Sequence, residues 1–109
     1  IVQSITVLDK DDQGIAFDIL LSPNSNSLGT FNAAPNISDA NAVGLHLAAS
    51  VAGSAYIDLG GSKLATLNNV GAMLESASSS RSVYIGGIAR GTPTHTASGL
   101  VILLSVLWL

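Results

Sequence analysis

The sequence predicts an all-β protein, a jelly-roll-like antiparallel β-sandwich of about seven to eight short strands in a single domain that covers residues 1–109. Three observations support this fold class. Apolar and polar residues alternate along several short segments, turn-forming residues separate these segments at intervals of roughly ten residues, and no segment keeps the 3.6-residue period of a helix over three turns. In a strand, alternate side chains face opposite sides of a sheet, so each such segment can cover one side of a core.

The clearest strand pattern lies in residues 15–22, where apolar and mixed side chains alternate over the whole segment. Residues 1–8 alternate more loosely. The charged sequence DKDDQG between these two segments, residues 9–14, predicts a hairpin-like connection. The side chains expected on the inner faces of the two strands are Ile5, Val7, Ile15, Phe17, Ile19 and Leu21.

Three segments in the middle of the chain continue this pattern. Residues 43–51 alternate, residues 63–77 carry one or two strands, and residues 82–90 carry another. A single helical turn that Ser38 or Asp39 could cap is expected before them. The side chains expected to face the core from these strands include Leu45, Leu47, Val51, Val83 and Ile85.

The chain ends on its most apolar stretch, GLVILLSVLWL, residues 99–109. A helix needs about 20 apolar residues to cross a bilayer, whereas this run has eleven residues and contains Ser105. Its length and the Gly and Pro residues before it favour a strand buried on both faces. Trp108 would either cap the end of the sandwich or anchor a neighbouring subunit, and the sequence favours neither role.

The sequence has only weak matches to catalytic, metal-binding and cofactor-binding motifs. We therefore expect that the protein is not an enzyme and has no catalytic residue, no cofactor and no bound metal. Asp9, Asp11 and Gly14 match three positions of a calcium loop, but Leu20 stands where that loop needs a bidentate Glu. The only two histidines, at positions 46 and 95, are far apart and lack the spacing of a zinc motif.

The composition points to a surface with little charge. Charged residues make up 10% of the chain, against about 25% in ordinary soluble domains, whereas 48% of the residues are hydrophobic. Copies of such a protein repel each other weakly, which suits an assembly subunit as well as a neutral monomer. The four basic residues are scattered along the chain, so neither nucleic acid nor a membrane is an expected partner.

Two segments, IVQSITVLDKDDQGIAFDILL and NNVGAMLESASSSRSVYIGGIARGTPTHTASGLVILLSVLWL, resemble small proteins encoded beside the major capsid gene of tailed bacteriophages. The shared patterns lie in Ile1 to Gln13, Ile37 to Ala40 and Arg90 to Leu100. The resemblance implies a further N-terminal segment before Ile1. It also implies a decoration or cement protein on the capsid surface of the virion, with the major capsid protein and copies of itself (a homo-oligomer) as partners.

The sequence also fits two other roles: a tail- or fibre-associated virion sandwich, and a carbohydrate-binding module, which would need exposed aromatic residues. Long loops tend to carry contacts, which draws attention to residues 22–38 and to the turn 90–95. The residues expected at an interface are Phe31, Arg90, Thr92, Pro93, His95 and Trp108.

Overall fold

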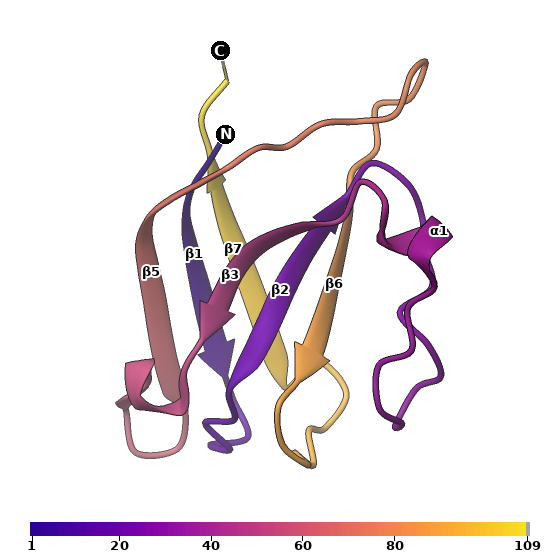
Figure 1. Ribbon diagram of the computed structural model, residues 1–109. Coiled ribbons are helices and arrows are strands. Elements are labelled where there is room, and N and C mark those ends of the chain that lie inside the picture. Colours follow the sequence, from indigo (N-terminus) through magenta and orange to yellow (C-terminus); the bar gives the residue numbers. More distant parts are fainter. Residues whose placement is uncertain (109) are drawn as a thin grey trace.

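The computed structural model describes residues 1–108 and shows two antiparallel β-sheets packed face to face (Figure 1). A single helical turn with Ser38 as its cap and a short 3₁₀ turn lie in the connecting segments, and no helix in residues 1–108 has the length and apolarity needed to cross a bilayer. The predicted antiparallel β-sandwich is confirmed, with seven strands. The first sheet has the order β4 (Ile57–Asp58), β5 (Lys63–Ala72), β1 (Val2–Asp9) and β7 (Leu100–Val106); the second has the order β3 (His46–Val51), β2 (Phe17–Ser22) and β6 (Tyr84–Ala89); the helical turn is α1 (Asp39–Ala42) and the 3₁₀ turn is Gly53–Ala55.

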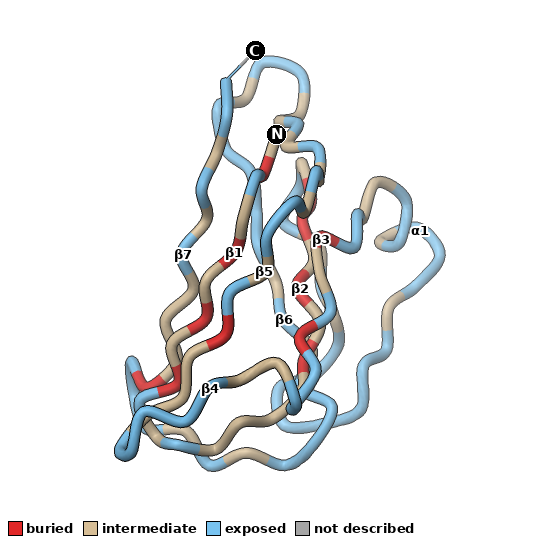
Figure 2. The backbone as a smooth tube through the Cα atoms, turned by 90° about the vertical axis from the view of Figure 1, so that its left-hand side faces the viewer, coloured by how far each residue is buried: buried red, intermediate tan, exposed pale blue. Residues whose placement is uncertain are grey.

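The core lies between the two central strands, β1 and β2. Their inward side chains are buried, and Figure 2 shows buried stretches in both layers of the sandwich. The alternation expected for the first two strands is confirmed, although β2 begins at Phe17 and leaves Ile15 in the preceding loop. The buried apolar residues of these two strands are Val2, Ile5, Val7, Phe17, Ile19 and Leu21.

The connection between β1 and β2 is not the hairpin that the sequence predicted, because the two strands belong to different sheets. The reason is Asp9, whose side chain is only 1% exposed. Its carboxylate accepts hydrogen bonds from the backbone N–H groups of Asp11 (3.0 Å), Gln13 (2.9 Å) and Gly14 (2.7 Å). These bonds fold residues 10–16, the β1–β2 loop, into a compact turn that leads the chain across to the other sheet.

The expected inward position of Leu47 is wrong: this side chain is 60% exposed on the outer face of the second sheet. The pairing of β2 with β3 shifts register between Ile19 and Leu20. Such a bulge changes which residues share a face, and here Ala48 and Val51 are the buried residues of β3. Strict alternation cannot anticipate the bulge.

The final apolar segment forms strand β7, but the expectation that it is buried on both faces is wrong. β7 is the edge strand of the first sheet and pairs only with β1. Leu103 on its outer face is 61% exposed, and Trp108 beyond the strand is 92% exposed, so Trp108 does not cap the sandwich. β6 is likewise an edge strand, and its inward residue Ile85 is therefore half exposed.

Candidate functional site

The β1–β2 loop meets residues 90–99, the β6–β7 loop, at one end of the sandwich. The carboxylate of Asp11 accepts hydrogen bonds from the hydroxyl and the backbone N–H of Thr96, both at 2.8 Å. These two bonds, the hydroxyl bond first, lower the pKa of the Asp11 carboxyl group. Gly99 packs so closely on the Asp11 carboxylate that a Cβ atom at this position would overlap it. The contact between the loops therefore requires glycine at position 99.

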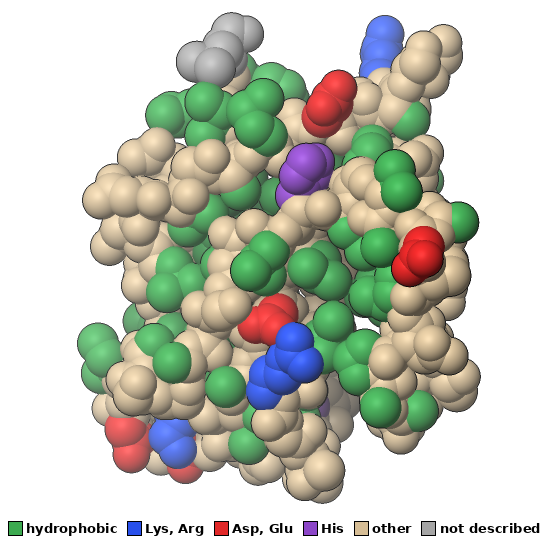
Figure 3. Space-filling view, in the orientation of Figure 1, with side chains coloured by type: hydrophobic (Ala, Val, Ile, Leu, Met, Phe, Trp, Pro, Cys, Tyr) green, Lys and Arg blue, Asp and Glu red, His purple; other side chains and the backbone are tan. Residues whose placement is uncertain are grey.

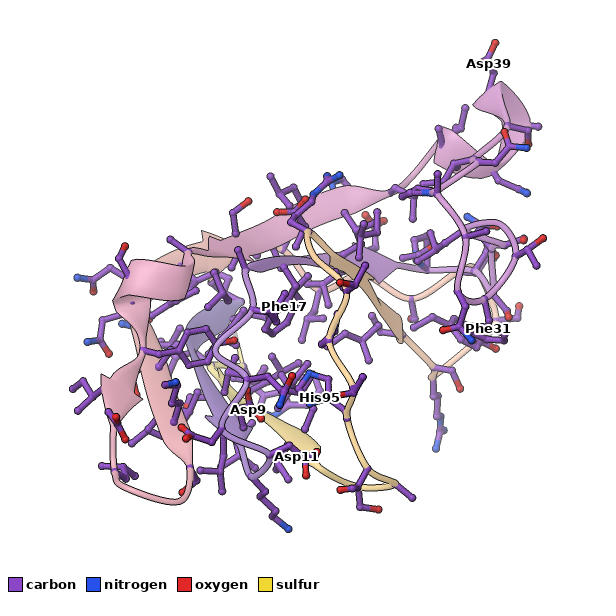
Figure 4. All side chains as sticks on the ribbon, turned by 90° about the horizontal axis from the view of Figure 1, so that it is seen from below. Asp9, Asp11, Phe17, Phe31, Asp39 and His95 are labelled. Atoms are coloured by element: carbon purple, nitrogen blue, oxygen red, sulfur yellow. The ribbon has the colours of Figure 1, made fainter. Side chains whose placement is uncertain are left out.

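His95 brings an imidazole to the same place. Its Nδ1 atom lies 3.6 Å from Oδ1 of Asp9 and 3.5 Å from Oδ2 of Asp11, is shielded from solvent and has no hydrogen-bond partner. Figure 4 shows the three side chains close together at this end of the molecule. Within residues 1–108, these three form the one cluster that could hold a metal ion, since each offers a ligand atom and these atoms lie within 4.8 Å of one another.

An apolar cavity of about 270 Å³ lies beside this cluster and opens between β6 and β7. The small residues Gly87 and Ala89 on the inner side of β6 leave this space. Tyr56 also lines the cavity and donates a hydrogen bond to the Ile15 carbonyl oxygen at 3.2 Å. Burial, and after it the negative charge of Asp9, raises the pKa of Tyr56 to about 12.

A second polar cluster lies on the outer face of the second sheet. Oδ1 of Asp18 accepts a hydrogen bond from the Ser50 hydroxyl, and its Oδ2 accepts one from Nε of Arg90, both at 2.7 Å. The Ser50 bond, followed by the Arg90 bond, holds the pKa of Asp18 below its ordinary value. Charged side chains are otherwise sparse on this face (Figure 3).

Apolar side chains cross the outer face of the first sheet. Residues directly opposite each other on antiparallel strands share a face. The pairing of β4, β5, β1 and β7 therefore places one apolar residue from each of the four strands side by side on this outer face. Leu103 is the next residue of β7 that points to the same side. We call the set formed by Ile57, Leu64, Leu8, Val101 and Leu103 the outer apolar row; Ile57 is 66% exposed and Leu103 is 61% exposed.

The residues expected at an interface do not form one surface. Phe31, 97% exposed, lies in the long loop between β2 and α1, which passes beside β6 in Figure 1, whereas Trp108 follows β7. In the β6–β7 loop, Thr92 is exposed and Pro93 lines the cavity. Arg90 contacts Asp18, and His95 faces the carboxylates of Asp9 and Asp11.

Sequence reasoning recognised Asp9 and Asp11 as possible ligands but did not connect them with His95. No spacing rule joins a residue in a loop to one far along the chain, and only the crossing of the strands between sheets brings them together. The outer apolar row was also missed. Residues 99–109 were expected to be buried on both faces, and the sequence does not show the strand pairing that brings Ile57, Leu64 and Leu8 into line with Val101. Comparison of the chain with protein-family models, with curated proteins and with solved structures gave no match.

Proposed function

We propose that the protein is a non-enzymatic structural subunit of a bacteriophage head, a decoration or cement protein that packs on the capsid surface. The outer apolar row carries the proposal. The outward face of an antiparallel sheet normally presents polar side chains to water, whereas this face presents Leu, Ile and Val residues from all four strands. Exposed apolar patches of this kind serve as surfaces for protein contacts.

The composition supports the same role. A chain in which 10% of the residues are charged meets little electrostatic resistance when copies crowd together on a shell. Burial of apolar surface stabilises by about 25 cal/mol per Å², and shell symmetry repeats each contact many times. The capsid as the specific partner rests on the resemblance of Ile1 to Gln13 and Arg90 to Leu100 to proteins encoded beside capsid genes.

A carbohydrate-binding role has less support. The two most exposed aromatic side chains belong to different parts of the fold: Phe31 lies in the long loop between β2 and α1, and Trp108 follows β7. The partners proposed for this protein are therefore the major capsid protein and further copies of the chain.

The test uses purified protein and phage heads that lack decoration. We expect the protein to bind the heads and to raise their melting temperature. Ile57→Asp and Leu103→Asp place charge in the outer apolar row and should weaken binding at least about 10-fold, which corresponds to roughly 1.4 kcal/mol. Leu47→Asp is the matched control, because Leu47 is 60% exposed on the outer face of the other sheet.

Two results would contradict the proposal. The first is failure of the unmodified protein to bind heads, including the case in which labelled protein binds only to tails. The second is a loss of binding in Leu47→Asp that is as large as the loss in Leu103→Asp. That result would mean that the outer apolar row is not the contact surface. Circular dichroism spectra of all variants verify that each has folded.

A further inference from the structure

We propose that Asp9, Asp11 and His95 bind a divalent transition-metal ion of the Zn²⁺ type, which links the β1–β2 loop to the β6–β7 loop. This inference does not depend on the proposed function. It rests on the geometry, burial and charge of these three side chains.

The geometry favours a shared ion over direct hydrogen bonds. The Nδ1 atom of His95 lies 3.6 Å from Oδ1 of Asp9 and 3.5 Å from Oδ2 of Asp11. These distances exceed the roughly 2.7–3.2 Å of an N–H···O hydrogen bond. Two ligands about 2.1 Å from one tetrahedral zinc ion lie roughly 3.4 Å apart, close to what is observed here.

Burial gives a second and independent indication. Nδ1 of His95 is shielded from solvent and has no hydrogen-bond partner, and a buried polar atom without a partner costs free energy. The Asp9 carboxylate beside it is 1% exposed. An ion between these atoms would supply the partner that the imidazole nitrogen lacks.

Charge gives a third indication. Within residues 1–108, Asp9 and Asp11 form no ion pair with Lys or Arg, since Lys63 pairs with Asp12 and Arg90 with Asp18. Metal binding requires the neutral form of histidine, and with that form the two carboxylates leave two negative charges. A divalent cation balances this charge.

Hydrogen bonds from neighbouring groups hold both carboxylates in place. Oδ2 of Asp9 accepts the N–H groups of Gln13 and Gly14, while Oδ1 of Asp9, which accepts only the Asp11 N–H, is the oxygen nearest His95. Thr96 fixes Asp11 in the same way. Ligands of natural metal sites are oriented by such surrounding bonds.

The ligand types select the class of metal. An imidazole nitrogen suits zinc and related transition metals, whereas Ca²⁺ and Mg²⁺ prefer oxygen ligands alone. The calcium-loop pattern that begins at Asp9 also places Leu20 where a calcium loop needs Glu. We therefore expect Zn²⁺ to bind more tightly than either Ca²⁺ or Mg²⁺.

The experiment titrates metal-free protein, prepared by dialysis against a chelator, with ZnCl₂, CaCl₂ and MgCl₂ in a calorimeter and repeats the thermal unfolding with each metal. We expect Zn²⁺ to bind one site and to raise Tm by about 10 °C at a concentration 100-fold above Kd. His95→Gln and Asp11→Asn should weaken Zn²⁺ binding at least about 10-fold.

Two control variants remove residues of the same chemical type that are not proposed as metal ligands. His46→Gln removes the other histidine, which is exposed on β3, and Asp12→Asn removes the next carboxylate of the same loop. Both should bind Zn²⁺ as the unmodified protein does. The proposal is overturned if Zn²⁺ does not bind, or if His95→Gln binds it with unchanged affinity.

A spectroscopic measurement keeps the proposal testable should His95→Gln or Asp11→Asn fail to fold. His46→Gln retains His95 as its single histidine. Zn²⁺ should shift the ¹⁵N resonance of the Nδ1 atom of His95 in this variant. An imidazole signal that stays unchanged when Zn²⁺ is added would overturn the proposal.

Discussion

The two long sides of the sandwich are built differently. On one side β3 packs against β5, and the buried residues Ala48, Val51 and Ala65 belong to the continuous core. On the other side β6 and β7 make few contacts with each other, and a cavity of about 270 Å³ lies between them. One side of the fold is closed and the other is open.

The difference follows from side-chain size and from strand pairing. The inner face of β6 presents Gly87 and Ala89 opposite Leu100 and Ile102 of β7, and these small residues cannot fill the space between the sheets. The two strands are connected by the β6–β7 loop, which Asp11 holds through Thr96. Apolar packing therefore stabilises the centre and the closed side, whereas polar contacts of a loop stabilise the open side.

The largest expected effect compares an isoleucine of the centre with one of the open side. Ile19→Ala removes a fully buried side chain of β2 and should lower the free energy of unfolding by about 3–4 kcal/mol. Ile85→Ala removes a side chain of β6 that is 50% exposed and should cost less than about 1.5 kcal/mol. Urea denaturation measures both values.

Equal losses in the two isoleucine variants would contradict this comparison. They would mean that Ile85 is buried in solution, and therefore that something covers the open side. Repeating the denaturation at several protein concentrations would then reveal whether further copies of the chain provide that cover.

The second prediction compares two glycines. Gly99→Ala forces a Cβ atom against the Asp11 carboxylate and should destabilise the protein by about 1–3 kcal/mol, because the β6–β7 loop must move away. Gly87→Ala places its Cβ atom 3.7 Å from the Asp18 carbonyl oxygen, an ordinary contact, and should stabilise by about 0.5–1 kcal/mol. Thermal unfolding gives both signs, and a loss of stability in Gly87→Ala would mean that the inner side of β6 has no spare room.

The centre of the fold could be predicted from the sequence, whereas the edges and the site could not. Alternation in β1 and β2 correctly placed Ile5 and Ile19 in the core, because the central strands obey the period of two. Alternation failed at Leu47, where a bulge changes the register. The apolar run of residues 99–109 predicted burial on both faces, but Leu103 lies on the uncovered outer face of the first sheet. Neither a bulge nor the position of a strand in its sheet can be recognised from the local pattern of residues.

The candidate site depends on contacts that are distant in sequence. The DKDDQG segment indicated charge at a turn, but the burial of Asp9 follows from its inward position at the end of β1. The approach of His95 follows from the strand order, which sets β7 beside β1 and so places the β6–β7 loop against the β1–β2 loop. The residues around His95 in the sequence therefore predict neither the burial of Asp9 nor the position of His95 beside it.

The smallest expected effect concerns Asp18 of β2, which binds Ser50 of β3 and Arg90, the first residue after β6. The pKa of Asp18 is lowered, so these contacts stabilise the folded protein while the carboxylate is charged. Their contribution is complete above the ordinary carboxyl pKa of 3.8 and disappears as the pH falls through the lower pKa of the folded state.

Because the Arg90 side chain is 55% exposed, we expect Asp18→Asn to lower the free energy of unfolding by only about 0.5–1 kcal/mol at pH 7. Urea denaturation at a series of pH values should show the gap between Asp18→Asn and the unmodified protein narrowing below pH 3.8, with Ser50→Ala giving a smaller gap. A gap that stays constant across this range would mean that the charge of Asp18 does not hold the open-side strand in place.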